Sequence, residues 1–165
     1  MSGSEITIQD GVARLRAEKG GAYLSHEMLQ PKDFVLQMDA RLVEGDKEAE
    51  WQVMFHNQSG EHWYAINLSS VPRTWYVKKR LAGQEYQFAS GVGNVSPLGE
   101  ITRIVVVTRG PRAAFYLNET PMAYFEDADF DTAGMIMLWC MSPGQVVCEF
   151  DNVRFWNLDN VPGLP

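Results

Sequence analysis

Four acidic residues alternate along one short stretch of the chain, and they are Glu44, Asp46, Glu48 and Glu50. On a β-strand, alternate side chains project from the same face, so four carboxyl groups would stand together. A pair of carboxyl groups at short range is the machinery that hydrolyses glycosidic bonds. Glycine, lysine and alanine separate the acids, however, and the stretch runs directly into a strand at Trp51. We therefore expect a solvated connecting loop here, and we assign no catalytic residue.

Other groups that often do chemistry lack the context they need. The three histidines have no metal-ligand spacing, and they are His26, His56 and His62. The segment Gly91-Val92-Gly93-Asn94 lacks the strand-to-helix setting of a phosphate-binding loop. The Gly-x-Ser-x-Gly elbow of serine hydrolases is missing.

The overall charge argues against nucleic acid as a partner. The net charge is -7 and the isoelectric point is near 4.9, whereas phosphate binding needs clustered lysine and arginine. No apolar run approaches the roughly 18 residues that span a bilayer. Residues 1–4 carry no signal-peptide pattern and could be a cloning addition, so an exported native protein would have lost its leader.

Two cysteines flank a predicted turn. Cys140 and Cys148 lie on either side of Ser142-Pro143-Gly144, so they could sit on facing strands within disulfide distance. We favour two buried thiols, and the disulfide remains the alternative.

The hydrophobic pattern predicts strands throughout. Apolar and polar residues alternate from Phe34 to Leu42, which is the period of a half-buried strand. Asp10-Gly11 is typical of a tight hairpin turn between residues 6–8 and 12–15. Roughly eleven short strands without helices predict an all-β fold, a two-sheet antiparallel β-sandwich or jelly roll. We expect a single domain over residues 1–165, with a tail at 157–165.

Several motifs in order resemble the concanavalin A-like (laminin G-like) jelly-roll superfamily, in particular its bacterial glycan-associated branch with keto-disaccharide hydrolase-like domains. The motifs are Asp33-Phe34, Val53-Met54-Phe55-His56, His62 to Leu68, Arg109-Gly110, Phe115 to Glu119, Asp127 to Phe130, Gly134 and Phe150-Asp151-Asn152-Val153. His56 stands where many relatives carry arginine, and Glu119 replaces the glycine of an Asn-Gly turn. The resemblance implies a jelly roll that holds glycans on one sheet. The acidic stretch does not match the laminarinase-type strand, in which apolar residues separate the acids.

The same resemblance raises calcium as a cofactor, since sandwiches of this superfamily often hold a structural ion. Asp127, Asp129 and Asp131 alternate, and Asp151 precedes an asparagine in the last strand. An acidic turn is the alternative that we favour, so we expect no cofactor.

The meander over residues 51–80 carries the candidate binding face. Pairing Phe55 with Tyr64 and Val53 with Ile66 gathers large apolar groups on a buried face. The opposite face then presents aromatic, amide and cationic side chains around Ala65, which suits sugar recognition. The predicted carbohydrate-binding residues are Gln52, His56, Trp63, Asn67, Tyr76, Lys78 and Arg80. The alternative is an ordinary solvated sheet face.

The sequence thus favours a non-catalytic carbohydrate-binding module whose partner is an oligo- or polysaccharide. A glycoside hydrolase that uses Glu44, Asp46 or Glu48 is one alternative, and a protein-interaction module without a small ligand is another. The resemblance implies an extracellular or cell-surface location. A larger multidomain parent protein is a separate hypothesis.

Overall fold

The computed structural model describes residues 3–130 and 132–161, and strands make up most of it. One sheet has seven strands in the spatial order β1 (Ser4–Gln9), β2 (Val12–Ala17), β13 (Val146–Asn157), β4 (Phe34–Glu44), β9 (Thr102–Arg109), β10 (Arg112–Leu117) and β11 (Thr120–Glu126). The other sheet has six, in the order β3 (Gly20–Ser25), β12 (Met135–Ser142), β5 (Glu50–Asn57), β6 (Trp63–Ser69), β7 (Thr74–Leu81) and β8 (Gln84–Val92). The only helical element in the described ranges is a short 3₁₀ turn at Ala128–Phe130.

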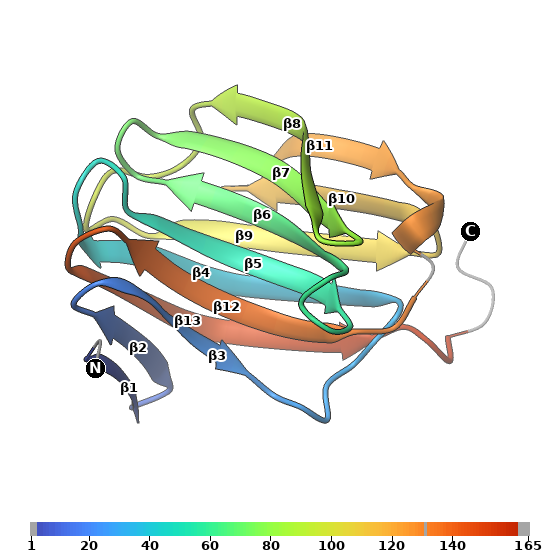
Figure 1. The fold of residues 1–165 in the computed structure, drawn as a ribbon, viewed down its shortest axis with the longest axis horizontal. Coiled ribbons are helices and arrows are strands. Elements are labelled where there is room, and N and C mark those ends of the chain that lie inside the picture. The colour runs from blue at the N-terminus through green and yellow to red at the C-terminus, as the bar shows by residue number, and fades with distance from the viewer. Residues whose placement is uncertain (1–2, 131, 162–165) are drawn as a thin grey trace.

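The two antiparallel sheets lie face to face, as Figure 1 shows, so the predicted two-sheet β-sandwich is confirmed. Within the described residues no helix is long and apolar enough to cross a bilayer. The sequence predicted roughly eleven strands, and the described residues form thirteen. The two that it missed, β3 and β8, are the edge strands of the six-stranded sheet. They contain a Gly-Gly pair and a polar run, so apolar alternation is weak there.

The core between the sheets is closed by aromatic contacts across the layers. Trp51 packs edge-on against Phe150 with ring centroids 6.3 Å apart, and Trp75 packs against Phe115 at 5.2 Å. All four rings lie inside the main hydrophobic cluster. Burial of these side chains on one face of β5 and β7 forces their neighbours in sequence onto the outer face.

The first hairpin has the turn that its sequence predicts. Asp10 and Gly11 both have positive φ, 52° and 86°, as a type I′ turn requires. Asn118 and Glu119 make the corresponding turn between β10 and β11, with φ values of 48° and 68°. Glu119 therefore adopts a left-handed conformation that glycine usually supplies.

Cys140 and Cys148 form a disulfide, with their Cα atoms 5.8 Å apart, so the expectation of two buried thiols is wrong. The reason lies in the topology. Cys140 is on β12 and Cys148 is on β13, which belong to opposite sheets, and both side chains point into the core. The turn between them crosses the sandwich and brings the two sulfur atoms together, which makes the bond a link between the layers.

Residues 157–161 of the predicted tail are held to the domain. The carboxylate of Asp159 accepts hydrogen bonds from the backbone N–H groups of Lys32 and Asp33, at 3.0 and 2.6 Å. Arg109 donates to the carbonyl oxygens of Leu158 and Val161. Residues 162–165 lie outside the described ranges.

Removing the disulfide should lower stability without changing the fold. Cross-linking residues eight apart in sequence restricts the unfolded chain by about 2.5 kcal/mol at room temperature. We expect the double substitution of Cys140→Ala and Cys148→Ala to reduce the free energy of unfolding in urea by about that amount. An unchanged urea midpoint would contradict a structural role for the bond.

Candidate functional site

The outer face of the six-stranded sheet, which we call the six-strand face, has the register inferred from the sequence. Gln52 pairs with Asn67 and Met54 with Ala65 between β5 and β6. Between β6 and β7, Asn67 pairs with Tyr76, Ala65 with Lys78 and Trp63 with Arg80.

Three more strands extend these rows beyond the predicted meander. One row runs Tyr23, Trp139, Gln52, Asn67, Tyr76 and Ser90, and the next runs Ser25, Met137, Met54, Ala65, Lys78 and Gln87. On β8, Glu85 pairs with Arg80. The face is therefore wider than the meander, and its second aromatic pair comes from β3 and β12.

His56 does not share this face, and the prediction that it does is wrong. Phe55 and His56 together stand opposite a single residue of β12, which is a β-bulge, and His56 has a φ of 52°. Its ring turns to the inner side and lies 6.0 Å from the ring of Phe34. Its Nδ1 is hydrogen-bonded to the carbonyl of Thr132, and burial lowers the pKa of the imidazole. Asn57 occupies the position on the six-strand face that the sequence predicted for His56.

Gly134 is required by this bulge. A Cβ atom at Gly134 would lie 2.4 Å from the carbonyl carbon of His56 and 2.7 Å from the N of Asn57. The chain entering β12 therefore passes directly against the bulge, which fixes both strands beside the site.

Trp63 and Tyr76 are on the outer face but are less open than the sequence suggested. The side chain of Trp63 is only 7% exposed and forms a small hydrophobic cluster with Met54, Ala65 and Met137. The ammonium of Lys78 lies 5.5 Å from the Trp63 ring centre and 5.9 Å from that of Tyr76. Both rings are therefore covered in part by a cation.

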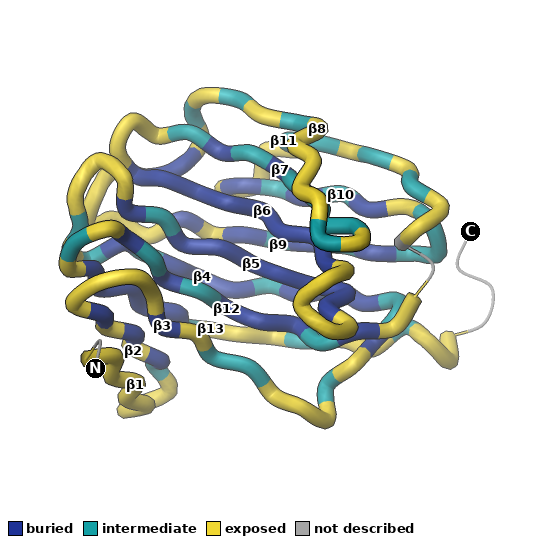
Figure 2. The backbone as a smooth tube through the Cα atoms, in the orientation of Figure 1, coloured by how far each residue is buried: buried dark blue, intermediate teal, exposed yellow. Residues whose placement is uncertain are grey.

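Figure 2 shows that β6 is buried along its whole length, and two amide side chains of the outer face are buried with it. Asn67 is fully buried beneath the surface, and Gln52 is nearly so. The outer face is therefore buried at β6 and more open at β7 and β8.

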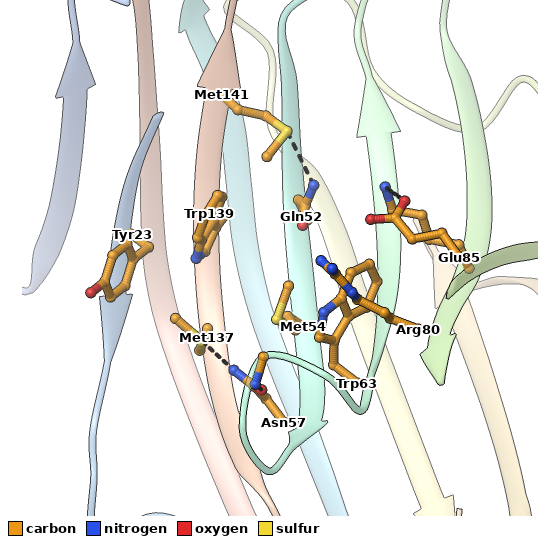
Figure 3. Close-up of a pocket in the computed structure, with 12 residues that line it drawn as sticks. Tyr23, Gln52, Met54, Asn57, Trp63, Arg80, Glu85, Met137, Trp139 and Met141 are labelled. Atoms are coloured by element: carbon orange, nitrogen blue, oxygen red, sulfur yellow. Dashed lines mark hydrogen bonds and ion pairs between the residues drawn. The ribbon is translucent and has the colours of Figure 1, made fainter. Parts of the chain in front are cut away.

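A pocket of about 450 Å³ opens on this face. Figure 3 shows Tyr23 and Trp139 on one side, Trp63 and Arg80 on the other, and Met54 between them. The rings of Tyr23 and Trp139 are stacked with centroids 5.4 Å apart and planes 17° apart, and Tyr23 is half exposed. Sequence analysis missed this pair because β3 was not recognised as a strand. The sequence signal that could have identified the pair was Trp139, which lies in the alternating run after Gly134.

A second hollow of about 430 Å³ lies on the other side of Trp139. It shares Trp139 and Met141 with the first pocket and is otherwise lined by Gly20, Gly21, Glu48 and the turn after β12. A Cβ atom at Gly21 would meet the Cys140 carbonyl at 2.9 Å, so this edge of the groove is bare backbone. The two hollows therefore adjoin at Trp139 and Met141.

The polar groups of the pocket have few strong partners. Lys78 donates to Glu85 at 3.0 Å. The amide of Gln52 donates to the sulfur of Met141 at 3.2 Å, and that of Asn57 donates to the sulfur of Met137 at 2.9 Å. Thioether sulfur is a weak acceptor, so both amides remain available to a better one.

Tyr76 and Glu50 form a pair at the edge of the face. The Tyr76 hydroxyl donates to Oε2 of Glu50 at 2.5 Å. Burial raises the pKa of Glu50, against the opposing effects of this hydrogen bond and of Lys78. Burial and the neighbouring carboxylate likewise raise the pKa of Tyr76. Its hydroxyl is committed to the protein, which leaves only its ring edge for a ligand.

The acidic stretch is a loop for most of its length, as expected. Asp46 accepts hydrogen bonds from the backbone N–H of Glu48 at 2.8 Å and from the Ser142 hydroxyl at 3.2 Å. Glu44 ends β4 and accepts from Gln145. None of these three acids lines the 450 Å³ pocket.

The calcium candidates are separated. Asp127 and Asp129 both pair with Lys79, at 2.5 and 3.1 Å, around the 3₁₀ turn. Burial opposes ionisation of Asp127, but hydrogen bonds from Lys79 and from the Asp129 N–H outweigh it and lower the pKa. Asp151 lies on β13 beside Asp39, and Asp131 is outside the described residues. No group of three His, Cys, Asp or Glu residues that could hold a metal ion occurs in the described ranges.

Comparison with known proteins supports the fold and no closer relationship. No protein-family model and no curated protein sequence matches the chain. The carbohydrate-binding module CBM66 of Bacillus subtilis superposes with a TM-score of 0.64 at 18% identity, covering 94% of this chain and 91% of that one. The laminarinase catalytic domain of Thermotoga maritima gives 0.71 at 14% identity, covering 92% and 80%. This chain has the concanavalin A-like jelly-roll fold. A putative glycosyl hydrolase of Parabacteroides distasonis also shares it, with a TM-score of 0.63 at 16% identity and coverage of 93% and 90%.

Because Trp63 is buried, Trp63→Ala should destabilise the protein. Removing a buried tryptophan leaves a cavity and costs about 3 kcal/mol. We expect the urea midpoint to fall accordingly, whereas Trp156→Ala, at an exposed ring on β13, should change it little. Equal small effects of both substitutions would show that Trp63 is an open platform after all.

The half-buried carboxyl of Glu50 should make stability depend on pH. Its pKa is raised in the folded state, so folding loses stability as the pH rises through the interval between the ordinary and the raised value. We expect Glu50→Gln to increase the melting temperature at pH 7 and to have a smaller effect near pH 4. Glu5→Gln on exposed β1 is the control, and an equal response of both variants would refute the assignment.

Proposed function

We propose that this domain binds an oligo- or polysaccharide in the groove of the six-strand face and does not cleave it. The observation that carries the proposal is the stacked pair of Tyr23 and Trp139 beside a pocket of about 450 Å³ with hydrogen-bonding groups opposite. The faces and the rim of a sugar ring need these two kinds of contact. The C–H groups pack on aromatic carbon, and the hydroxyl groups need fixed polar partners.

The pocket supplies both at once. Trp139 and Tyr23 offer a rigid apolar surface, while Gln52, Asn57 and Arg80 lie across the groove. Relative to the residues predicted from sequence, the proposal keeps Gln52, Trp63, Lys78 and Arg80 at the pocket. Asn67 and Tyr76 become supports beneath and beside it.

The fold neighbours support a saccharide as the partner. One is described as a carbohydrate-binding module, and others are described as laminarinases or glycosyl hydrolases. They include both binding and catalytic domains, so the choice between binding and catalysis rests on this chain's residues.

Residues of the pocket favour binding alone. Hydrolysis by the usual mechanisms needs two carboxyl groups that flank the scissile bond. Among the described residues that line the pocket, Glu85 is the one carboxylate, and it is paired with Lys78. Glu44 and Asp46 line neither hollow, and Glu48 is the one carboxylate among the described residues that line the second, so neither hollow supplies the pair that hydrolysis needs.

The disulfide agrees with an extracellular or cell-surface site of action. Disulfides persist in oxidising compartments, which include the cell exterior. We infer that the module works there, as the superfamily resemblance implies, and propose separately that it is part of a larger protein. A calcium ion at the acidic turn stays a separate hypothesis, which a chelator-sensitive melting temperature would support.

The proposal is tested on a glycan array followed by calorimetry with the best ligand. Trp139→Ala and Tyr23→Ala should each weaken binding about tenfold or more, because aromatic contacts of this kind contribute up to about 1.5 kcal/mol beyond their buried area. Tyr124→Ala, at an exposed ring on β11 of the other sheet, is the matched control and should leave affinity unchanged.

Two results would overturn the proposal. One is the absence of any bound glycan with a protein whose melting curve is cooperative. The other is equal affinity of the Trp139→Ala variant and the parent. Release of reducing sugar by the parent protein would instead favour the hydrolase.

A further inference from the structure

The pocket has an unusual balance of hydrogen-bond donors and acceptors. Lys78 and Arg80 bring two cationic groups, and Glu85 is the one anion among the described lining residues. The chain as a whole has a net charge of -7, so this surface carries the opposite sign to its surroundings. Such a local excess attracts anions.

Arg80 is the member of this set without a carboxylate partner. Glu85 is its neighbour in register on β8 but pairs with Lys78 instead. The Nε atom of Arg80 is buried and has no hydrogen-bond partner. Its register partner is Trp63, and both residues line the pocket. A guanidinium presents a planar fork of donors that matches a carboxylate or sulfate.

The neutral donors of the pocket are similarly under-used. The NH₂ groups of Gln52 and Asn57 donate to thioether sulfur atoms, as dashed lines in Figure 3 mark. The indole N–H of Trp139 is buried without any acceptor. Both amide side chains are more than nine-tenths buried, so solvent does not readily replace those weak acceptors.

Two of the acceptors in the same place are already engaged. The Glu85 carboxylate accepts from Lys78, and Oδ1 of Asn57 accepts from the backbone N–H of Gly60 at 3.0 Å. Oδ1 of Asn67 has no partner, but this residue lies beneath the surface and does not line the pocket. A neutral sugar offers hydroxyl groups that both donate and accept. A pocket with more spare donor groups than spare acceptors suits a ligand that mainly accepts.

We propose that the saccharide is anionic, with a carboxylate or sulfate group bound by Arg80 and Lys78 while its ring packs on Trp139 and Tyr23. This rests on the proposed function and specifies the ligand class. The anionic group is assigned to the 450 Å³ pocket alone, because the hollow beyond Trp139 brings the carboxylate of Glu48 and no cation among its described lining residues.

The test is calorimetry with four polymers on the intact chain. Polygalacturonate supplies carboxylates, dextran sulfate supplies sulfates, and laminarin and dextran are neutral. We expect one anionic polymer to bind at about 50 mM NaCl and to bind more weakly at about 0.5 M, because salt screens the contact. Which one binds assigns the anionic group.

Arg80→Gln should weaken that binding about tenfold or more, since a charge-assisted hydrogen bond is lost. Arg16→Gln removes the same charge from an exposed site on β2 of the other sheet and should leave affinity unchanged. Equal losses in both variants would mean that net charge alone drives association, which overturns the inference.

The remaining outcomes separate this inference from the proposed function. Binding of laminarin or dextran that needs Trp139 and ignores Arg80→Gln overturns the anionic ligand and leaves saccharide binding intact. If none of the four polymers binds the parent protein or changes its melting temperature, both the anionic ligand and saccharide binding are overturned.

Discussion

The burial of one face of β5, β6 and β7 against the seven-stranded sheet is the constraint on which the rest of the structure depends. Trp51, Phe55 and Trp75 must all point inward to meet Phe150, Phe34 and Phe115, and their ring centroids lie 5.2–6.3 Å from those partners. A slip of one residue in any strand would expose these rings and bury charged neighbours. The register of the outer face is therefore fixed by the core and not by the ligand site itself.

That constraint is why the sequence predicted so much of the geometry. The inner partners of the meander are large and apolar, so the outer rows followed directly from alternation. Alternation cannot anticipate a bulge, which is why His56 was placed on the wrong face. The bulge is packed against the chain at Gly134, so it involves a contact between segments far apart in sequence.

The binding site predicted from the sequence was incomplete for a related reason. Tyr23 lies on β3, an edge strand that begins with two glycines, and its partner Trp139 comes from a strand over 100 residues further along the chain. Only the folded topology places them side by side. The exposure of Trp63 and Tyr76 could not be predicted from the sequence either. It depends on long side chains such as Lys78 that fold over neighbouring rings. The disulfide similarly depended on the assignment of β12 and β13 to opposite sheets.

The central claim is that a saccharide contacts the six-strand face at Trp139. The chain has five tryptophans, and their indole N–H groups give separate signals in a ¹H–¹⁵N NMR spectrum. During titration with the bound polysaccharide, the account predicts large shifts for Trp139 and Trp63 and none for Trp156 on the other sheet. A saturable shift of Trp156, with Trp139 unmoved, would contradict it.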